Sequence, residues 1–322
     1  MGATLSQSKD KIATRVAYGK ELVELGKTNP DIVVLDADLC GSTQTKFFAK
    51  EFPNRFFNMG IAEQNMIAVA AGLSTCGLIP FASSFAMFAC GRAWEMVRNS
   101  VCHNEFNVKV CATHAGLTLG EDGSSHQIIE DIAIMRAIPQ MTVLVPADAT
   151  ETKFMTRALV KHFGPAYMRL GRSNVPVLFD EDTFKFEIGK AQVINPGVDV
   201  SIFACGIMVS RALWAADILK QEGISAEVIN VSTIKPIDKE TILSSIQKTG
   251  CAVTAEEHNL HGGLGDAIAT VLSENQPVHL KQIGVKDKFG QSGDGEELLI
   301  HYGLSKENIV SASKEVIRRK NK

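Results

Sequence analysis

Short apolar runs alternate with longer amphipathic segments along this chain, and the alternation restricts the possible folds more than any other feature. It is typical of β-α-β units, in which helices join the parallel strands of one sheet. In the first half the predicted strands are Asp31–Asp36, Phe56–Asn58, Leu78–Ala82, Val108–Thr113, Met141–Val145 and Ala166–Leu170. The helices predicted around them are Lys11–Lys27, Ala62–Thr75, Phe85–Val101, Ile128–Ala137 and Ala149–His162. The first half is therefore expected to be an α/β domain with a parallel sheet.

The alternation is interrupted once, between Phe179 and Pro196, where charged residues precede the turn Asn195-Pro-Gly197. It then resumes with the predicted strands Asp199–Ala204, Ala226–Val231, Cys251–Ala255 and Val278–Val285. A chain of 322 residues is long enough for two ordinary domains. We therefore predict two α/β domains, residues 1–179 and 197–322, joined by a linker of residues 180–196.

Composition excludes several classes of function. A net charge of -3, with no basic run before the tail Arg318-Arg-Lys-Asn-Lys322, argues against a nucleic-acid partner. No apolar run reaches the roughly 18 residues of a membrane span. The seven cysteines are scattered and contain no C-x-x-C pair, which disfavours a disulfide framework or a zinc site. We expect a cytoplasmic protein with free thiols and with no nucleic-acid or membrane partner.

The segment Arg55–Leu73 places a single acid, Glu63, between a short apolar strand and a helix of small residues. In α/β proteins, ligands usually bind at the ends of strands, where helices begin. A glutamate in the first turn of a helix also commonly complements the helix dipole. Position alone therefore leaves two roles open for Glu63.

A glycine-bearing loop, Thr113–Gln127, follows another predicted strand and carries His114, Asp122 and His126. Two imidazoles and a carboxylate on one loop are suited to proton transfers on a polar substrate. The two histidines are twelve positions apart without a third close ligand, which disfavours a metal site. A hydrolase triad with Ser124 is disfavoured because no G-x-S-x-G turn is present.

Two of these segments resemble motifs of a known family. Met59-Gly-Ile-Ala-Glu-Gln-Asn65 resembles the glutamate motif of the thiamine-diphosphate enzymes, above all that of transketolase, and the loop Thr113–Gln127 resembles the transketolase active-site loop. The resemblance implies that Glu63 bonds and activates the aminopyrimidine of the cofactor. It also implies that His114 and His126 bind sugar oxygens and move protons, and that Asp122 recognises a hydroxyl of the acceptor.

The same resemblance extends to six more residues. It implies that Phe85 and Phe88 form an aromatic wall against the aminopyrimidine and that Asp38 lies near the cofactor. It also implies that the sugar phosphate is held by Arg15, Ser42 and Arg172. Guanidinium groups match the geometry of a phosphate dianion. By themselves, two phenylalanines three positions apart are also common in helix cores, and an isolated arginine is commonly a surface charge.

Two glycine-rich segments of the second half invite cofactor roles. In Glu256–Asp266 the glycines fall as G-G-x-G, which differs from the dinucleotide pattern G-x-G-x-x-G. Gly293-Asp-Gly295, with Asn321 downstream, matches the spacing with which the family holds the cofactor's pyrophosphate through a metal. Asn321 is the penultimate residue, and the surrounding segment resembles the family's carboxy-terminal F-G-x-S-G sequence. We therefore reject it as a pyrophosphate motif.

The resemblance covers the later half of a transketolase, from about Lys11 to Lys314. It implies a pyrimidine-binding domain with a parallel sheet, followed by a C-terminal domain with a mixed sheet. The pyrophosphate-binding domain, which holds Mg2+ or Ca2+ in the family, is missing, so no metal ligand is predicted here. We expect thiamine diphosphate to be shared with a separate N-terminal, pyrophosphate-binding subunit in an α2β2 heterotetramer. The implied reaction is the transfer of a two-carbon ketol unit from a ketose phosphate to an aldose phosphate, as in the pentose phosphate pathway.

Three other functions remain open. Half of a 1-deoxy-D-xylulose-5-phosphate synthase and the beta subunit of a 2-oxo acid dehydrogenase would share Glu63. The pair Thr113-His114, with Arg15 and Arg172, favours transketolase over both. A non-catalytic regulatory subunit is disfavoured because Glu63 and the polar residues of the loop are all present.

Overall fold

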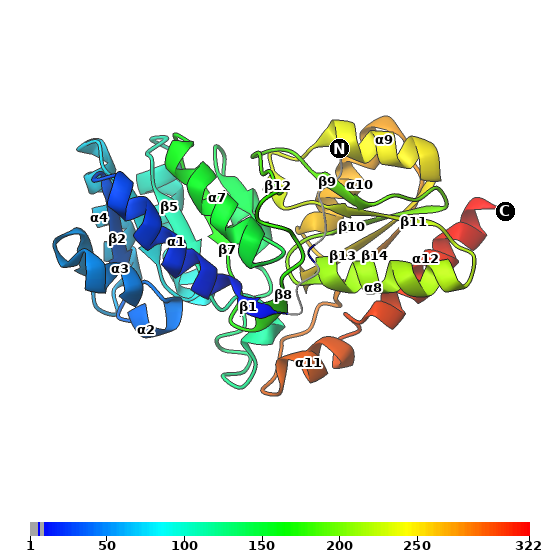
Figure 1. The fold of residues 1–322 in the computed structure, drawn as a ribbon, viewed down its shortest axis with the longest axis horizontal. Helices are drawn as coiled ribbons and strands as arrows, with labels where there is room; N and C mark the ends of the chain where they lie inside the picture. Colours follow the sequence, from blue (N-terminus) through cyan, green and yellow to red (C-terminus); the bar gives the residue numbers. More distant parts are fainter. Residues whose placement is uncertain (1–5, 7–9) are drawn as a thin grey trace.

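The computed structural model describes residue 6 and residues 10–322, and its two α/β domains lie side by side along the long axis of the molecule (Figure 1). The first domain is built on a seven-stranded sheet and the second on a five-stranded sheet. The predicted fold class, two α/β domains, is therefore confirmed. Residues 1–5 and 7–9 of the predicted first domain lie outside the described part of the chain.

The first sheet has the strand order β12-β6-β7-β5-β4-β2-β3. Its strands are β2 (Ile32–Asp36), β3 (Phe56–Asn58), β4 (Ile79–Ser83), β5 (Lys109–Ala112), β6 (Thr142–Leu144), β7 (Ala166–Arg169) and β12 (Thr233–Lys235). Neighbours pair in parallel except β12, which runs antiparallel to β6. All six strands predicted for the first half are present in this sheet.

Helices cover both faces of the first sheet, which is why its central strands are buried and mostly apolar. Alternate residues of β2 pack against α1 (Thr14–Thr28) and α7 (Ala149–Lys161) on one face and against α4 (Glu63–Thr75) on the other. Shorter helices complete the domain; they are α2 (Cys40–Thr43), α3 (Lys46–Glu51), η1 (Pro53–Arg55), η4 (Leu117–Leu119) and α6 (Asp131–Arg136).

Two predicted helices differ from the structure. The predicted helix Lys11–Lys27 begins as a strand, β1 (Lys11–Ala13), which pairs with β8 (Asn174–Pro176) before α1 starts. The predicted helix Phe85–Val101 is not regular. It consists of two π-helical segments, η2 (Met87–Arg92) and η3 (Val97–Cys102), with the short α5 (Trp94–Met96) between them. π-Helical turns are frequent at functional sites.

The second sheet has the order β14-β13-β10-β11-β9. Its strands are β9 (Gln192–Asn195), β10 (Val200–Ala204), β11 (Ala226–Asn230), β13 (Cys251–Asn259) and β14 (His279–Val285). β9 runs antiparallel to β11 and the other pairs are parallel, so the sheet is mixed. The helices are α8 (Met208–Gln221), α9 (Lys239–Thr249), α10 (Leu264–Asn275), α11 (Gly295–His301) and α12 (Lys306–Lys320).

The range predicted as a linker, residues 180–196, contains strand β9, so the second sheet begins within it. Phe184, in the same range, is buried against the core of the second domain. Strand β9 was not predicted because it lies at the edge of the sheet, where only one face has to be buried, and charged residues surround it in the sequence.

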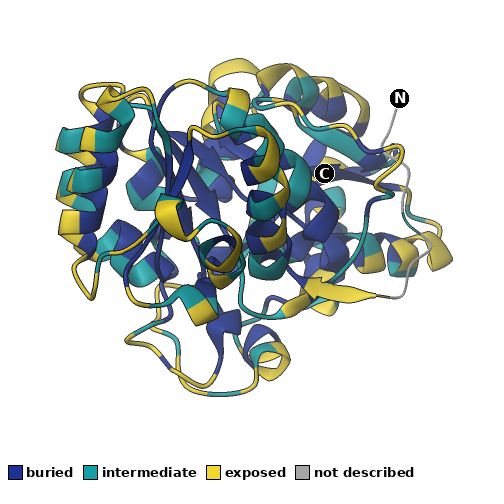
Figure 2. Ribbon diagram, turned by 60° about the vertical axis from the view of Figure 1, so that its left-hand side comes forward, coloured by how far each residue is buried: buried dark blue, intermediate teal, exposed yellow. Residues whose placement is uncertain are grey.

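The two domains share structure beyond this connection. Strand β12 belongs to the second half of the chain but completes the edge of the first sheet. One hydrophobic cluster runs from Val143 in the first sheet to Phe203 and Ile229 in the second. Figure 2 shows the central strands of both sheets buried and the outer helix faces exposed. Among the described residues, no helix is long and apolar enough to cross a membrane.

Candidate functional site

Glu63 opens α4, directly beyond the end of β3, and its side chain is buried. Its Oε2 atom accepts a hydrogen bond from Nη1 of Arg92 at 2.8 Å, and the pair forms a salt bridge. Arg92 is the last residue of η2 and is half exposed. The prediction from sequence did not include Arg92, whose contact with Glu63 joins two segments separated by 29 positions.

Two phenylalanines extend this ion pair into an aromatic surface. The rings of Phe85 and Phe88 lie 6.1 Å apart between centroids and are nearly parallel, with an interplanar angle of 14°. The guanidinium of Arg92 lies over Phe88 at 4.6 Å from its centroid. Phe88 is only partly buried and is not part of the hydrophobic core clusters. The partial exposure of Phe88 favours the predicted aromatic wall over a simple core pair.

Both predicted histidines contact this aromatic surface. His114 stacks on Phe85 with 3.9 Å between ring centroids, and His126 meets the face of Phe88 edge-on at 5.4 Å. A backbone bridge between Phe85 and Thr113 fixes the first contact. The structure therefore brings both histidines and both phenylalanines together, and Phe88 connects them through Arg92 to Glu63.

His114 has an unusual backbone and an unusual charge state. Its φ of 62° lies in the left-handed region, which is uncommon for residues other than glycine. Burial, with a smaller effect of the positive charges of Arg15 and Arg172, lowers its pKa to about 3. Its Nδ1 lies 2.8 Å from Oγ1 of Thr113. His114 is therefore neutral at physiological pH and can exchange hydrogen bonds without carrying a charge.

Arg15 and Arg172 line an open cavity of about 290 Å3. Nη1 of Arg15 donates to the carbonyl oxygen of Ser42 at 2.6 Å, and its Nε donates to the carbonyl oxygen of Arg172 at 3.3 Å. Burial and the nearby charge of Arg172 lower the pKa of Arg15. Two guanidinium groups that repel each other across a cavity favour an anion between them. Ser42 is not among the residues that line this cavity; its carbonyl oxygen holds the guanidinium of Arg15.

The two remaining predicted site residues, Asp122 and Asp38, are exposed and do not line this cavity. Asp122 is exposed in the loop that carries both histidines. Asp38 is also exposed, has a φ of 63°, and accepts a hydrogen bond from Nδ2 of Asn58 at 2.9 Å. The neighbouring Asp36 is buried and holds the turn after β2, accepting from the amide of Leu39 and from the hydroxyl of Thr43.

The rejected motif Gly293-Asp-Gly295 lies in the wall of the same cavity. Asp294 caps α11 by accepting hydrogen bonds from the amides of Glu296 and Glu297. The described residues contain no group of three or more His, Cys, Asp or Glu side chains arranged to hold a metal. All seven cysteines are free, as predicted.

Comparisons with known proteins agree with this arrangement. The family model for the transketolase pyrimidine binding domain matches residues 10–177, and that for the transketolase C-terminal domain matches residues 189–309. A protein described as a transketolase C-terminal section, from Methanocaldococcus jannaschii, is 52% identical over 95% of this chain and 96% of its own length. A 6-deoxy-6-sulfo-D-fructose transketolase subunit from Clostridium sp. is 44% identical over 95% of both chains.

A solved structure described as a split gene transketolase, inactive beta4 tetramer, is 54% identical to this chain and superimposes with a TM-score of 0.90. The match covers 96% of this chain and 99% of the other. The similarity thus extends over both domains and over almost the full length of that subunit.

Proposed function

This chain belongs to the transketolase family, as the carboxy-terminal half, and we propose that it is a catalytic subunit that acts only with a separate pyrophosphate-binding subunit. The observation that carries the proposal is the buried Glu63 beside the aromatic surface of Phe85 and Phe88, with both histidines on the same surface. In the proposed α2β2 assembly, the partner subunit holds the pyrophosphate and its Mg2+ or Ca2+.

The family depends on thiamine diphosphate, and the contacts of Arg92 support the fit of its aminopyrimidine to this site. The guanidinium is flat, lies over Phe88, and donates to Oε2 of Glu63. An aminopyrimidine is also flat and would present a ring nitrogen to the same carboxyl group. We assign Glu63, Phe85 and Phe88 to this ring and Asp38 to its surroundings. Arg92 has to release or share Oε2 when the ring binds.

When bound, thiamine diphosphate supplies the nucleophilic carbon and the electron sink for two-carbon transfer. Glu63 holds the proton shared with the pyrimidine nitrogen. Neutral His114 donates to or accepts from a sugar hydroxyl without adding charge to the site. His126, which contacts Phe88, moves a proton on the sugar, and Asp122 bonds a hydroxyl of the acceptor.

The cavity between Arg15 and Arg172 is assigned to the anionic end of the sugar, and Ser42 is assigned to the same end because its carbonyl oxygen holds Arg15. We propose a ketose phosphate as donor and an aldose phosphate as acceptor, as in the pentose phosphate pathway. A relative from Clostridium sp. is named for a sulfonated sugar, and a sulfonate would also suit two guanidinium groups. Phosphate and sulfonate sugars should therefore be compared directly as substrates.

The rival activities would use the same Glu63 with other substrates. A 1-deoxy-D-xylulose-5-phosphate synthase condenses pyruvate with glyceraldehyde 3-phosphate, and a 2-oxo acid dehydrogenase transfers an acyl group to lipoamide. Two arginines in one cavity favour phosphorylated substrates over lipoamide. A regulatory subunit would have no need of the contacts that bring Glu63, His114 and His126 to one surface.

The test is two-carbon transfer by this chain reconstituted with candidate pyrophosphate-domain chains and saturating cofactor. Glu63→Ala should lower the rate by about 10²–10⁴-fold, the range for removal of a proton-transfer group. Glu95→Ala, which removes an exposed acid from α5 in the same domain, should leave the rate unchanged. Full transfer by the Glu63→Ala complex, once its assembly is verified, would rule out the catalytic assignment.

A further inference from the structure

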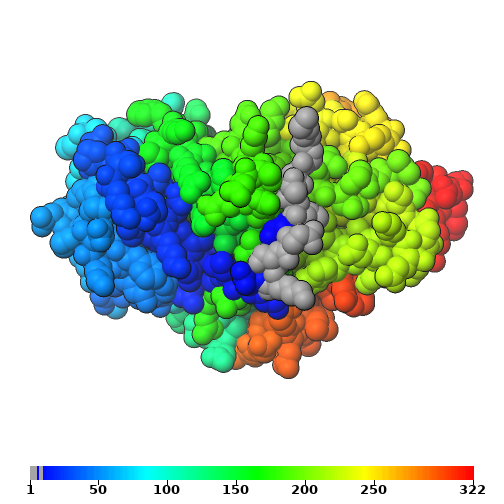
Figure 3. Space-filling model, in the orientation of Figure 1, coloured from blue at the N-terminus to red at the C-terminus, as the bar shows by residue number. Residues whose placement is uncertain are grey.

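The active-site loop, defined here as residues 114–127, rests on the second domain. Figure 3 shows this loop, in teal, against the segment that leads into α11, in orange, at the lower edge of the molecule. The backbone amide of Thr118 donates to Oε1 of Glu257 at 2.6 Å, and Nε2 of Gln127 donates to the carbonyl oxygen of Gln291 at 3.0 Å. Both acceptors belong to the second domain, so that domain holds the loop near each end.

Glu257 is buried at the end of strand β13, where it joins the loop to a charged network. Its carboxylate lies 3.8 Å from Nη1 of Arg169, and its carbonyl oxygen accepts from Nη2 of the same residue at 2.9 Å. Nε of Arg169 donates to Oδ2 of Asp131 at 2.7 Å. Desolvation raises the pKa of Glu257, and Arg169 and the amide of Thr118 oppose that rise.

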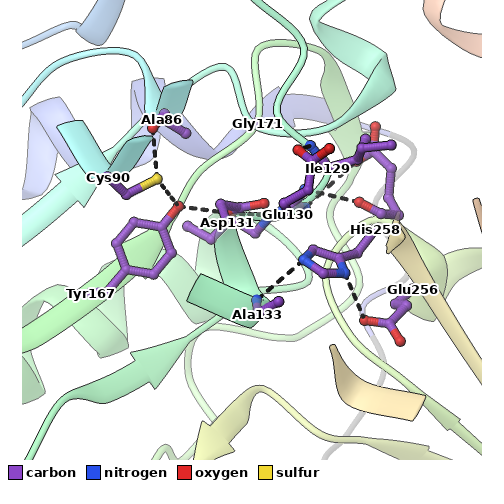
Figure 4. Close-up of polar contacts among 12 residues, drawn as sticks. Ala86, Cys90, Ile129, Glu130, Asp131, Ala133, Tyr167, Gly171, Glu256 and His258 are labelled. Carbon is purple, nitrogen blue, oxygen red and sulfur yellow. Dashed lines mark hydrogen bonds and ion pairs between the residues drawn. The ribbon is translucent and has the colours of Figure 1, made fainter. Parts of the chain in front are cut away.

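The network continues towards the aromatic surface. Tyr167 donates its hydroxyl to Oδ2 of Asp131 at 2.7 Å, and Figure 4 shows Tyr167 between Asp131 and Cys90. Cys90 lies in η2, the segment that carries Phe88 and Arg92. A continuous set of polar contacts therefore connects the second domain, the active-site loop and the aromatic segment.

Glycines occur where the loop and the second domain approach most closely. A Cβ atom on Gly116, whose φ is +83°, would overlap the carboxylate of Glu257. A Cβ on Gly290 would collide with Oε1 of Gln127, and a Cβ on Gly123 would lie 2.6 Å from Oγ of Ser292. Side chains at these positions would push the loop away, so the fit depends on their absence.

Gln127 directly follows His126 and fixes that end of the loop. Besides the carbonyl oxygen of Gln291, those of Leu117 at 3.0 Å and Gly120 at 3.2 Å lie within hydrogen-bonding distance of its Nε2, whose two hydrogens are shared among the three. Leu119, next to Thr118, accepts a hydrogen bond from Nη1 of Arg172. The position of the loop therefore also determines where Arg172 faces the anion cavity.

We propose that Glu257 is a positioning residue, through which the second domain holds the active-site loop in the geometry needed for sugar binding. Glu257 does not touch the substrate; it acts through the amide of Thr118, on a loop that bears His114, Asp122 and His126. This inference rests on the proposed function of that loop. It gives the second domain a role in catalysis beyond the stability of the subunit.

The chain offers a matched control in the neighbouring buried acid, Glu256. Its two oxygens accept hydrogen bonds from the amides of Leu264 and Gly265, both at 2.7 Å, at the start of α10. Its Oε2 also lies 3.8 Å from Nδ1 of His258, whose Nε2 accepts from the amide of Ala133 in α6, so this second contact reaches the first domain at α6 and not at the loop (Figure 4). Glu256→Ala removes a buried carboxylate without releasing the loop. Glu257→Gln retains a carbonyl oxygen that can accept from Thr118, whereas Glu257→Ala does not.

The first measurement is amide hydrogen exchange of residues 114–127 in the purified chain, which does not depend on activity. Glu257→Ala should speed exchange across the loop by at least about tenfold, equivalent to about 1.4 kcal/mol. Glu257→Gln should restore most of the protection, and Glu256→Ala should leave the loop protected while lowering the melting temperature. Equal loop protection in the two alanine variants would overturn the proposal, as would failure of Glu257→Gln to restore it.

The second measurement is made on the reconstituted complex. Glu257→Ala should lower kcat/KM for the phosphorylated donor by at least about tenfold, with cofactor affinity kept within about threefold of wild type. Unchanged kinetics in a complex whose loop exchanges faster would contradict the positioning role. If the wild-type complex showed no transfer at all, the proposed function would fail, and the exchange result would still decide whether Glu257 holds the loop.

Discussion

His114 shows how single residues acquire their properties from this fold. The residue lies two positions beyond the end of β5, and its left-handed backbone places the imidazole on Phe85. The same position buries the ring near the charges of Arg15 and Arg172, which keeps the ring neutral. A neutral imidazole suits the recognition of sugar hydroxyls next to an anion cavity, because the positive charge is already supplied by the arginines.

This charge state has a consequence for stability. Unfolded His114 takes up a proton near pH 6.5, whereas the folded residue resists protonation until about pH 3. The folded pKa is the lower one, so the unfolded state binds more protons in this window and the free energy of unfolding falls as pH decreases through it. In denaturant titrations between pH 7 and pH 5, the wild type should lose about 2 kcal/mol more of its free energy of unfolding than His114→Asn does. A difference independent of pH would mean that His114 is not held neutral.

At this scale, much of the site could be predicted from sequence, but not all. Glu63, Phe85, Phe88, His114 and His126 lie in two recognisable motifs and one aromatic segment, and the structure brings them to one surface. Arg92 and Glu257 could not be predicted in the same way. Their roles come from contacts with residues 29 and 139 positions away, and nothing in their local sequence marks those contacts.

Whole elements were predicted best where they are buried. Strands β2 and β5 are buried on both faces and consist mostly of apolar residues, a pattern that predicts a central strand. The short strands β1, β9 and β12 were missed because they lie at sheet edges, where a few residues with little apolar pattern suffice. The π-helical segments η2 and η3 were predicted as part of one α-helix, because the spacing of their apolar residues is close to that of an α-helix.

Strand β12 comes from the second half of the chain but pairs in the first sheet, which predicts that the two domains unfold together. Separating the domains would expose the edge of β6, and it would also break the buried bond from Nδ2 of Asn230 to Glu151. The chain has two tryptophans, Trp94 in the first domain and Trp214 in the second. In Trp94→Phe and Trp214→Phe variants, the remaining tryptophan should report an unfolding midpoint that coincides with far-UV circular dichroism. Separate midpoints for the two reporters would show that the domains unfold independently.

The whole molecule combines the site of Glu63, Phe85 and Phe88 with an open cavity lined by Arg15 and Arg172. The second domain contacts both. Glu257 accepts a hydrogen bond from Thr118 in the active-site loop, and Gly293–Gly295 form part of the cavity wall. The residues described by the structure provide no metal cluster for a pyrophosphate. Because the matching family models are those of the transketolase pyrimidine binding and C-terminal domains, our central proposal is that catalysis requires a second kind of subunit.

Calorimetry of thiamine diphosphate with Mg2+ tests that claim most directly. This chain alone should bind the cofactor with a dissociation constant above about 1 mM, because the proposal assigns the pyrophosphate and its metal to the partner subunit. After addition of the correct pyrophosphate-domain subunit, the constant should fall to about 1 μM or below, a gain of roughly 4 kcal/mol. Micromolar binding by this chain alone would contradict the account.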